Sequence, residues 1–302
     1  MRGALGGWID SGARLTEGRV VDGIDWLRIV PFVAVHLGCL AAFWVGVSVV
    51  AILAAIAAYL VRMFAITAFY HRYFSHRAFR TSRAVQLVGA VLGAAATQRG
   101  ALWWCGKHRQ HHRAADTPDD PHAPAHGFLR SHFGWFLTRR HFDANARLTR
   151  DWRKFPELVW LDRYDALVPV VFAALMFGLG ALLEAAIPAW RTSGLQMLVW
   201  GYCVSTVCLY HATFSINSMA HRFGTRRFET KDESRNNRWL ALVTLGEGWH
   251  NNHHRYAGAA RQGFFRGETD VTFQVLRLLE RGGIVWDLKP VPEHVLAEGA
   301  RR

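Results

Sequence analysis

IVPFVAVHLGCLAAFWVGVSVVAILAAIAAYLVRMFAITAFY, at residues 29–70, is an apolar run in which Arg62 is the only permanently charged side chain. The hydrocarbon core of a bilayer is about 30 Å thick and an α-helix rises about 1.5 Å per residue, so one crossing needs about 20 residues. The run is long enough for two crossings. We therefore predict transmembrane helices over 29–47 and 49–70, with a hairpin at residues 46–48.

Outward from this run, two further apolar stretches predict a third and a fourth span, at 166–188 and 194–216. The apolar stretch 84–98 is too short for a crossing and is typical of a buried or interfacial helix. The remaining segments, 71–165 and 217–302, carry nearly all of the Lys and Arg that follow the first span, together with many aromatic and histidine residues. We expect them to form a helical cap, which can bury polar groups that lipid cannot.

The composition agrees with a membrane protein. Half of the chain is hydrophobic (51%), yet its net charge is +13, which indicates apolar spans joined to basic surfaces that face anionic headgroups or acidic partners. Because the loops on the far side of the spans carry only Arg191, the positive-inside rule places both termini and the cap in the cytoplasm. We predict one all-α integral membrane domain over 1–302, with no nucleic-acid partner.

Nine of the sixteen histidines recur in patterned positions. Three boxes are present, and one histidine follows the fourth predicted span in Asn217-Ser-Met-Ala-His221. The boxes read His71-Arg-Tyr-Phe-Ser-His76, His108-Arg-Gln-His111-His112 and His250-Asn-Asn-His253-His254. Two His-x-x-His-His strings are far more than this histidine content yields by chance. With two predicted spans between the second and third boxes, all of the boxes fall on one side of the membrane.

The spacing of the boxes predicts convergence on metal. Positions i, i+3 and i+4 share a helix face, whereas adjacent residues diverge by about 100°. His111 and His112 can therefore reach different metals. The first box has a spacing of five, about 140° on an α-helix, so it requires a π-turn or a helix end near His71. We interpret the remaining histidines as ordinary residues, with His36 and His211 hydrogen-bonded inside the spans.

The number of histidines bears on the metal. Imidazole suits zinc, copper, iron and nickel, but a zinc ion takes only three or four protein ligands. Nine histidines suit two metals better. Carboxylates could orient the imidazoles by accepting their second N–H, and the sequence offers four candidates near the boxes. These are Asp119, Asp120, Asp232 and Glu247.

With these boxes the chain resembles the membrane fatty-acyl desaturases, and most of all their bacterial acyl-CoA or delta-9 branch. The resemblance runs from about residue 31 to 296 and includes Gly246-Glu-Gly before the last box, Asp120-Pro-His122 and Ser131-His-Phe-Gly-Trp135. It departs from animal relatives at Lys107, where they carry an acidic residue, and at Trp249, where they carry Phe.

The resemblance implies a di-iron site, an oxygen-dependent reaction and a bacterial inner-membrane location. Two iron ions (Fe2+/Fe3+) would be held by nine histidines, with an asparagine contributing through water. A separate electron donor, a ferredoxin or a cytochrome b5-like protein, would supply two electrons. The enzyme would place a cis double bond, at the ninth carbon, in a long-chain fatty-acyl substrate. The implied metal-site residues are His71, His76, His108, His111, His112, Asn217, His221, His250, His253 and His254.

Three other functions stay open at this point. A lipid or alkane hydroxylase of the same superfamily would share the ligand boxes, so only its products distinguish it. A membrane zinc hydrolase would need fewer histidines and an acidic residue acting as a base. A metal transporter would place its ligands at mid-bilayer, whereas the boxes here lie outside the predicted spans.

Overall fold

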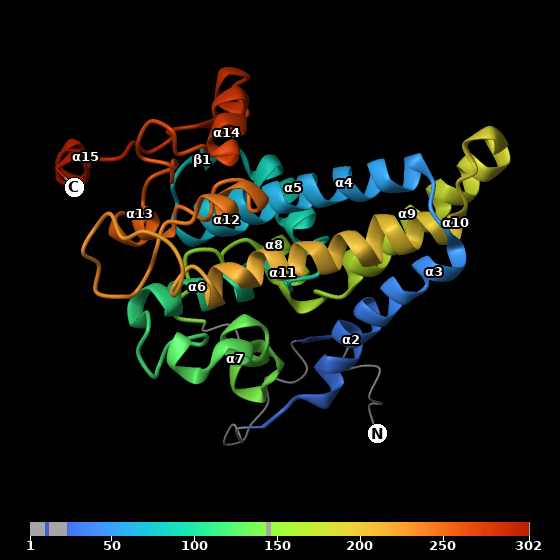
Figure 1. Ribbon diagram of the computed structural model, residues 1–302, viewed down its shortest axis with the longest axis horizontal. Helices are drawn as coiled ribbons and strands as arrows, with labels where there is room; N and C mark the ends of the chain where they lie inside the picture. The colour runs from blue at the N-terminus through green and yellow to red at the C-terminus, as the bar shows by residue number, and fades with distance from the viewer. Residues whose placement is uncertain (1–9, 12–22, 143–145, 302) are drawn as a thin grey trace.

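The structure is a computed structural model that describes residues 10–11, 23–142 and 146–301. Within these ranges, three helical segments are long and apolar enough to cross a membrane, at Val49–Ser75, Leu167–Ala186 and Gly194–Ser218. They lie side by side along the long axis of the molecule (Figure 1). The first consists of α4 (Val49–Phe64) and the π-helix η2 (Ala65–Ser75), the second is α9 (Leu167–Ala186), and the third consists of α10 (Gly194–Gln196), the π-helix η7 (Met197–Val204) and α11 (Ser205–Ser218).

The first predicted span, 29–47, is shorter than expected. It forms α2 (Trp26–Leu40) and α3 (Ala42–Val45), of which Ile29–Val45 is apolar. The helix ends where Gly46 adopts a φ of 67°, a conformation that glycine permits. At about 1.5 Å per residue this apolar helix falls short of a 30 Å bilayer core. The described residues thus hold three candidate spans rather than the predicted four.

The other predicted boundaries agree closely with the structure. The turn at residues 46–48 is present, and the Ser48 side chain caps α4 by accepting a hydrogen bond from the backbone N–H of Ala51. The short apolar stretch predicted at 84–98 forms α5 (Arg83–Ala94), which does not reach the length of a span.

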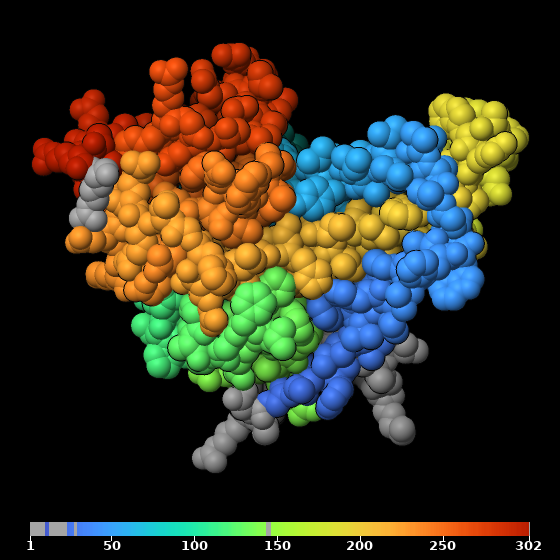
Figure 2. Space-filling view, viewed as in Figure 1, coloured from blue at the N-terminus to red at the C-terminus, as the bar shows by residue number. Residues whose placement is uncertain are grey.

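Short helices lie at one end of the long apolar helices (Figure 1). They come from residues on both sides of α9–α11, and they form the broad end of the molecule in Figures 1 and 2. In chain order they are α6 (Ala101–Ala114), η3 (Pro124–His126), α7 (Phe128–His132), η4 (Gly134–Leu137), η5 (Arg139–His141), α8 (Pro156–Arg163), α12 (Arg238–Val243), α13 (His250–Arg255), α14 (Val271–Arg281) and α15 (Glu293–Ala300). A two-stranded antiparallel sheet pairs β1 (Arg80–Thr81) with β2 (Val285–Trp286). The 3-10 turn η6 (Pro188–Trp190), in yellow in Figure 1, lies at the opposite end of the molecule.

The two ends differ in what they bury. At the narrow end, Phe43 and Trp44 are 86% and 81% exposed, which suits contact with lipid tails. At the broad end, Tyr70, Phe74 and Leu102 are fully buried in the main core, where η2 packs against α5 and α6. This core fixes the positions of the first two histidine boxes. The termini, whose predicted side depends on residues 1–9 and 302, lie outside the described residues.

Candidate metal centre

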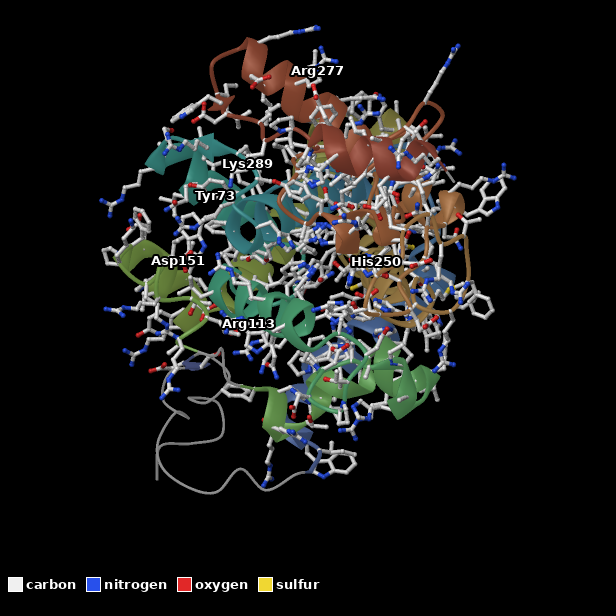
Figure 3. All side chains as sticks on the ribbon, turned by 90° about the vertical axis from the view of Figure 1, so that its left-hand side faces the viewer. Tyr73, Arg113, Asp151, His250, Arg277 and Lys289 are labelled. Carbon is white, nitrogen blue, oxygen red and sulfur yellow. The ribbon has the colours of Figure 1, made fainter. Side chains whose placement is uncertain are left out.

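The nine patterned histidines converge at the cap end of the spans and form two adjoining groups. Figure 3 looks onto this end of the molecule, with His250 labelled near the middle of the view. In each group, one nitrogen of every imidazole lies within 4.8 Å of the corresponding nitrogens of the others. The five-histidine group consists of His71, His76, His108, His112 and His253, and the four-histidine group consists of His111, His221, His250 and His254.

The first box depends on a π-helix, as its spacing of five requires. His71 lies within η2, and His76 is the residue that ends it, with its backbone N–H bonded to the His71 carbonyl. The i→i+5 turn is wider than an α-turn, so the two rings meet on the same side, with centroids 5.0 Å apart. Of the two predicted alternatives, a π-turn or a helix end near His71, the structure has the π-turn.

The second box lies on α6, where helical periodicity distributes its histidines between the two groups. His108 and His112 are four residues apart, and their Nε2 atoms are 3.0 Å apart in the five-histidine group. His111 points to the four-histidine group, with its Nε2 3.2 Å from that of His254. His111 and His112 thus lie in different histidine groups, while their binding to different metals stays a prediction.

The third box lies on α13 and divides in the same way. His253 joins the five-histidine group, with its Nε2 3.0 Å from that of His71 and 2.9 Å from that of His112. His250 and His254 join the other group, and the His250 Nε2 lies 3.0 Å from that of His221. The box therefore bridges the two groups, as adjacent positions on a helix must.

The Gly-Glu-Gly string explains how α13 reaches this position. Gly246 has a φ of 130°, and a Cβ there would lie 2.5 Å from a carboxylate oxygen of Asp270. A Cβ on Gly248 would lie 2.0 Å from the backbone nitrogen of Ala241 in α12. Only glycine fits either position. The tight turn also directs the intervening Glu247 inward, where it is buried next to His71.

Four carboxylates accept hydrogen bonds from the outer Nδ1 atoms of the histidines. Asp120 contacts His111 at 3.0 Å, Asp232 contacts His254 at 2.8 Å, and Glu247 contacts His71, as the sequence predicted. The fourth partner, Asp116, lies 3.1 Å from His221 and was not predicted. It replaces Asp119, which is exposed and contacts Gln110 only through its backbone carbonyl.

Burial of the rings keeps most of them in the neutral form that binds metal. Burial, together with neighbouring imidazoles, lowers the pKa of His76, His108, His112, His250 and His253 well below the usual value. Burial also lowers the pKa of His254 to about 4, although Asp232 opposes the shift. Burial opposes protonation of His111 as well, but Asp120 outweighs it and raises the pKa.

The carboxylates themselves stay ionised. Burial would raise the pKa of Asp120 and of Asp232, but the facing imidazoles outweigh it and hold both pKa values well below the usual range. Burial likewise acts against ionisation of Glu247, whose pKa is lowered by His71 and by Arg72. Neutral imidazoles backed by ionised carboxylates are the donor set that a divalent transition metal requires. The residues present therefore fit two metal ions.

Two cavities with shared lining residues meet at the histidines. The larger, of about 490 Å³, is lined mainly by apolar and aromatic side chains of α2, α6, η4, α9 and α11, and reaches His108. The smaller, of about 50 Å³, lies between the two groups and is lined by His71, His111 and His250. Trp104, His108, Thr213 and Asn217 line both cavities. Asn217 thus faces the centre, although it is not a member of either histidine group.

The remaining histidines behave largely as expected. The Nδ1–H of His36 donates to the Phe32 carbonyl at 2.7 Å, and its Nε2 lies 3.2 Å from that of His211, which confirms the predicted hydrogen bonding. His132 extends this contact from α7, 3.0 Å from His211. His122 is closer to the centre than predicted, because its Nδ1 lies 3.6 Å from Asp120 and its ring packs on His111.

The two departures from animal relatives have structural counterparts. Lys107 is buried and lines the larger cavity. The indole N–H of Trp249 donates to the backbone carbonyl of Thr269 at 2.8 Å, so this side chain contributes to packing beside α13.

Long apolar helices, nine histidines in two groups that could each hold a metal ion, and an adjacent apolar cavity are the features of a membrane-associated enzyme for apolar substrates. The family model for fatty acid desaturase matches residues 42–263. The chain belongs to the fatty acid desaturase family, and it is an oxidoreductase that desaturates fatty-acyl chains.

Named relatives cover between 71% and 95% of the chain. An sn-1 stearoyl-lipid 9-desaturase of Anabaena variabilis is 33% identical over 273 residues, covering 88% of this chain and 94% of the relative. An sn-2 palmitoyl-lipid 9-desaturase of Nostoc sp. is 36% identical over 220 residues, covering 71% and 73%. An acyl-CoA 5-desaturase of Anemone leveillei is 32% identical over 302 residues, covering 95% and 86%. The relatives thus differ in double-bond position and in acyl carrier.

Proposed function

We propose that this desaturase holds one iron in each histidine group and uses dioxygen to place a cis double bond at the ninth carbon of a long-chain acyl substrate. The observation that carries the proposal is the division of nine inward-facing imidazoles into two adjoining groups at the end of an apolar cavity. Two irons would supply the oxidising power to remove hydrogen from an unactivated methylene pair, which acid–base groups cannot do. Asn217 would contribute through water.

The chain's own residues have three tasks in this reaction. Asp116, Asp120, Asp232 and Glu247 fix the orientation of four imidazoles, so that the Nε2 lone pairs face inward. The aromatic lining of the larger cavity excludes water from the acyl chain. The ring of Trp104 stacks on His108, with centroids 5.1 Å apart, and forms the wall where the two cavities meet.

The position of the double bond depends on this wall, because only the carbons held beside the centre react. The side-chain amide of Gln98 donates to the Thr213 hydroxyl at 3.1 Å and accepts from the indole N–H of Trp104 at 3.4 Å. The three side chains therefore fix one another where the cavities join. The 9-desaturases among the relatives support the ninth carbon, and we propose chains of sixteen or eighteen carbons.

The stoichiometry requires an external reductant. Each turnover converts CH2–CH2, O2, two electrons and two protons into CH=CH and two waters. We propose that a separate acidic one-electron carrier, a ferredoxin or a cytochrome b5-like protein, supplies the electrons. We further propose a single domain over 1–302 in the bacterial inner membrane, with the centre and both termini on the cytoplasmic side and the apolar helix Ile29–Val45 completing a four-helix membrane region.

Expression in a host that lacks desaturases tests the proposed reaction. Gas chromatography with mass spectrometry should show palmitoleate or oleate appearing at the expense of the saturated acid, in aerobic cells that contain a competent donor. Anaerobic cultures should show neither product. Purified protein should contain about two irons per chain, as the two histidine groups require. If only hydroxylated products form, the proposed desaturation is wrong and the protein is a hydroxylase. Full activity with zinc and no iron would refute the di-iron site.

A further inference from the structure

A basic hollow opens on the cap beside the first histidine box. It has a volume of about 680 Å³, and its lining includes five arginines and a single carboxylate. The charged lining residues are Arg77, Arg109, Arg113, Arg147, Arg150 and Asp151. Figure 3 looks onto this end of the molecule, where the labelled Arg113 and Asp151 lie to one side of His250. Such an excess of one charge in a hollow concentrates the field and attracts an acidic partner.

The arginines of the hollow divide into two kinds. Arg109 is committed to the fold, since its guanidinium donates to the carbonyls of Phe74 and Ser75 and pairs with Asp151 at 2.8 Å. Arg77 also pairs with Asp151. Arg113 and Arg150, by contrast, are exposed, and they form no hydrogen bond or ion pair with the residues that the structure describes. These two charges are available to a partner.

The floor of the hollow includes a member of the metal centre. His76 lines the hollow and belongs to the five-histidine group, where its Nε2 lies 2.8 Å from that of His108. A partner in the hollow is therefore separated from the centre by one imidazole. A second basic hollow of about 310 Å³, which includes Arg277 and Lys289, is lined by none of the nine histidines.

The hollow and the large apolar cavity approach the centre from different sides. They share no lining residue, although each reaches the five-histidine group, the hollow through His76 and the cavity through His108. An acyl chain and an electron carrier could therefore be bound at the same time. On the basis of the proposed function, we infer that the hollow is the docking site of the acidic one-electron donor.

The chemistry of the donor follows from the stoichiometry. One turnover needs two electrons, so a one-electron carrier must dock, be oxidised and leave twice. Rapid exchange favours exposed charges at the edge of an interface, which speed association without fixing a long-lived complex. Arg113 and Arg150 have this character. The same charges could instead contact anionic lipid headgroups, which the experiment must separate from donor docking.

Two matched double variants test the docking site. Arg113→Glu with Arg150→Glu reverses the charges of the hollow, and Arg277→Glu with Lys289→Glu makes the same change in net charge at the second hollow. With a reduced plant-type [2Fe–2S] ferredoxin as donor, the first variant should raise the KM for donor by about tenfold at low ionic strength. Its kcat at saturating donor should stay within about twofold of the wild-type value, and the control variant should change the KM little.

Further measurements separate a docking defect from damage to the centre. Iron content should be unchanged, and protein reduced with dithionite should give the wild-type yield of unsaturated product in a single turnover with oxygen. The milder pair Arg113→Gln with Arg150→Gln should raise the KM by a smaller factor. The KM of the wild type should rise with salt more steeply than that of the charge-reversed variant, because steering is screened.

Several results would overturn the docking site. If both double variants raised the KM for donor equally, the increase would be due to the net charge of the protein and not to the hollow. Loss of binding to vesicles containing phosphatidylglycerol, with an unchanged KM for donor, would assign the hollow to lipid. A wild-type protein that forms no unsaturated product after dithionite reduction would instead refute the proposed function, whatever the donor kinetics show.

Discussion

The five-histidine and four-histidine groups come from the same end of the molecule but differ in their surroundings. Three of the four histidines in the smaller group bond a carboxylate through Nδ1, namely His111, His221 and His254. In the larger group the only such contact in the described residues is His71 with Glu247, and that carboxylate also pairs with buried Arg72. The smaller group therefore has fewer rings but more negative charge behind them.

This difference has a consequence for metal binding. A carboxylate that accepts the Nδ1 proton makes the Nε2 atom a stronger donor and fixes the ring. The pKa shifts differ within the group, since Asp120 raises the pKa of His111, whereas burial outweighs Asp232 and lowers the pKa of His254 to about 4. We expect metal affinity in the four-histidine group to depend on the carboxylates that hydrogen-bond its imidazoles. In the five-histidine group we expect it to depend on the number of imidazole ligands.

The largest expected effect tests whether both groups are required. His253→Ala removes a ring from the five-histidine group, and His254→Ala removes the adjacent ring from the other. Each should reduce desaturation to background and lower the iron content, because neither metal alone completes the proposed reaction. His126→Ala, at an exposed position outside both groups, is the control and should retain activity. An active His254→Ala protein with one iron would show that the smaller group is dispensable.

The next largest effect should come from the aspartates behind the four-histidine group, whose substitution should lower iron affinity in that group alone. Asp116→Asn, Asp120→Asn and Asp232→Asn each weaken a ring of the four-histidine group, and each should lower its iron affinity by about 10- to 100-fold. Dialysis against a graded chelator series should then leave about one iron per chain, whereas the wild type keeps two. Asp119→Asn is the matched control, because Asp119 contacts none of the histidines through its side chain. Equal loss of both irons would contradict the assignment.

Substitution of Glu247 should have a different effect, because its carboxylate stabilises the fold as well as orienting the His71 ring. Its carboxylate is buried between His71, Arg72 and Gln262. Glu247→Gln keeps the shape but leaves Arg72 paired only with Asp270, so we expect the protein to lose about 2 kcal/mol of stability. The thermal unfolding midpoint of the detergent-solubilised protein should fall, with the metal-free protein showing the same difference. A midpoint that changes only when iron is bound would restrict Glu247 to the metal site.

Sequence patterns captured the features of this site that depend on local spacing. The i, i+4 pairs of α6 and α13 and the π-turn at His71 follow from helix geometry, and the apolar runs gave the three long helices within two or three residues, apart from the π-helical extension to Ser75. Asp116 lies only four residues after His112, but distance along the chain does not show which carboxylate faces a ring, and its partner His221 is outside the three boxes. The first helix ends two residues before its predicted boundary, at the turn of residues 46–48 that the sequence did predict.

His122 offers the smallest effect and tests the boundary of the four-histidine group. Its ring packs on His111 at a centroid distance of 4.3 Å, and it shares Asp120, so proximity alone would make it a fifth ligand. However, it groups only with His111 and Asp120, its Nδ1 lies 3.6 Å from the carboxylate, and burial lowers its pKa to about 3, so it stays neutral. His122→Phe keeps the packing and should leave two irons per chain, with activity within a few-fold of the wild-type value. Loss of one iron would instead add His122 to the four-histidine group, and the two groups would then hold their metals by equal numbers of rings.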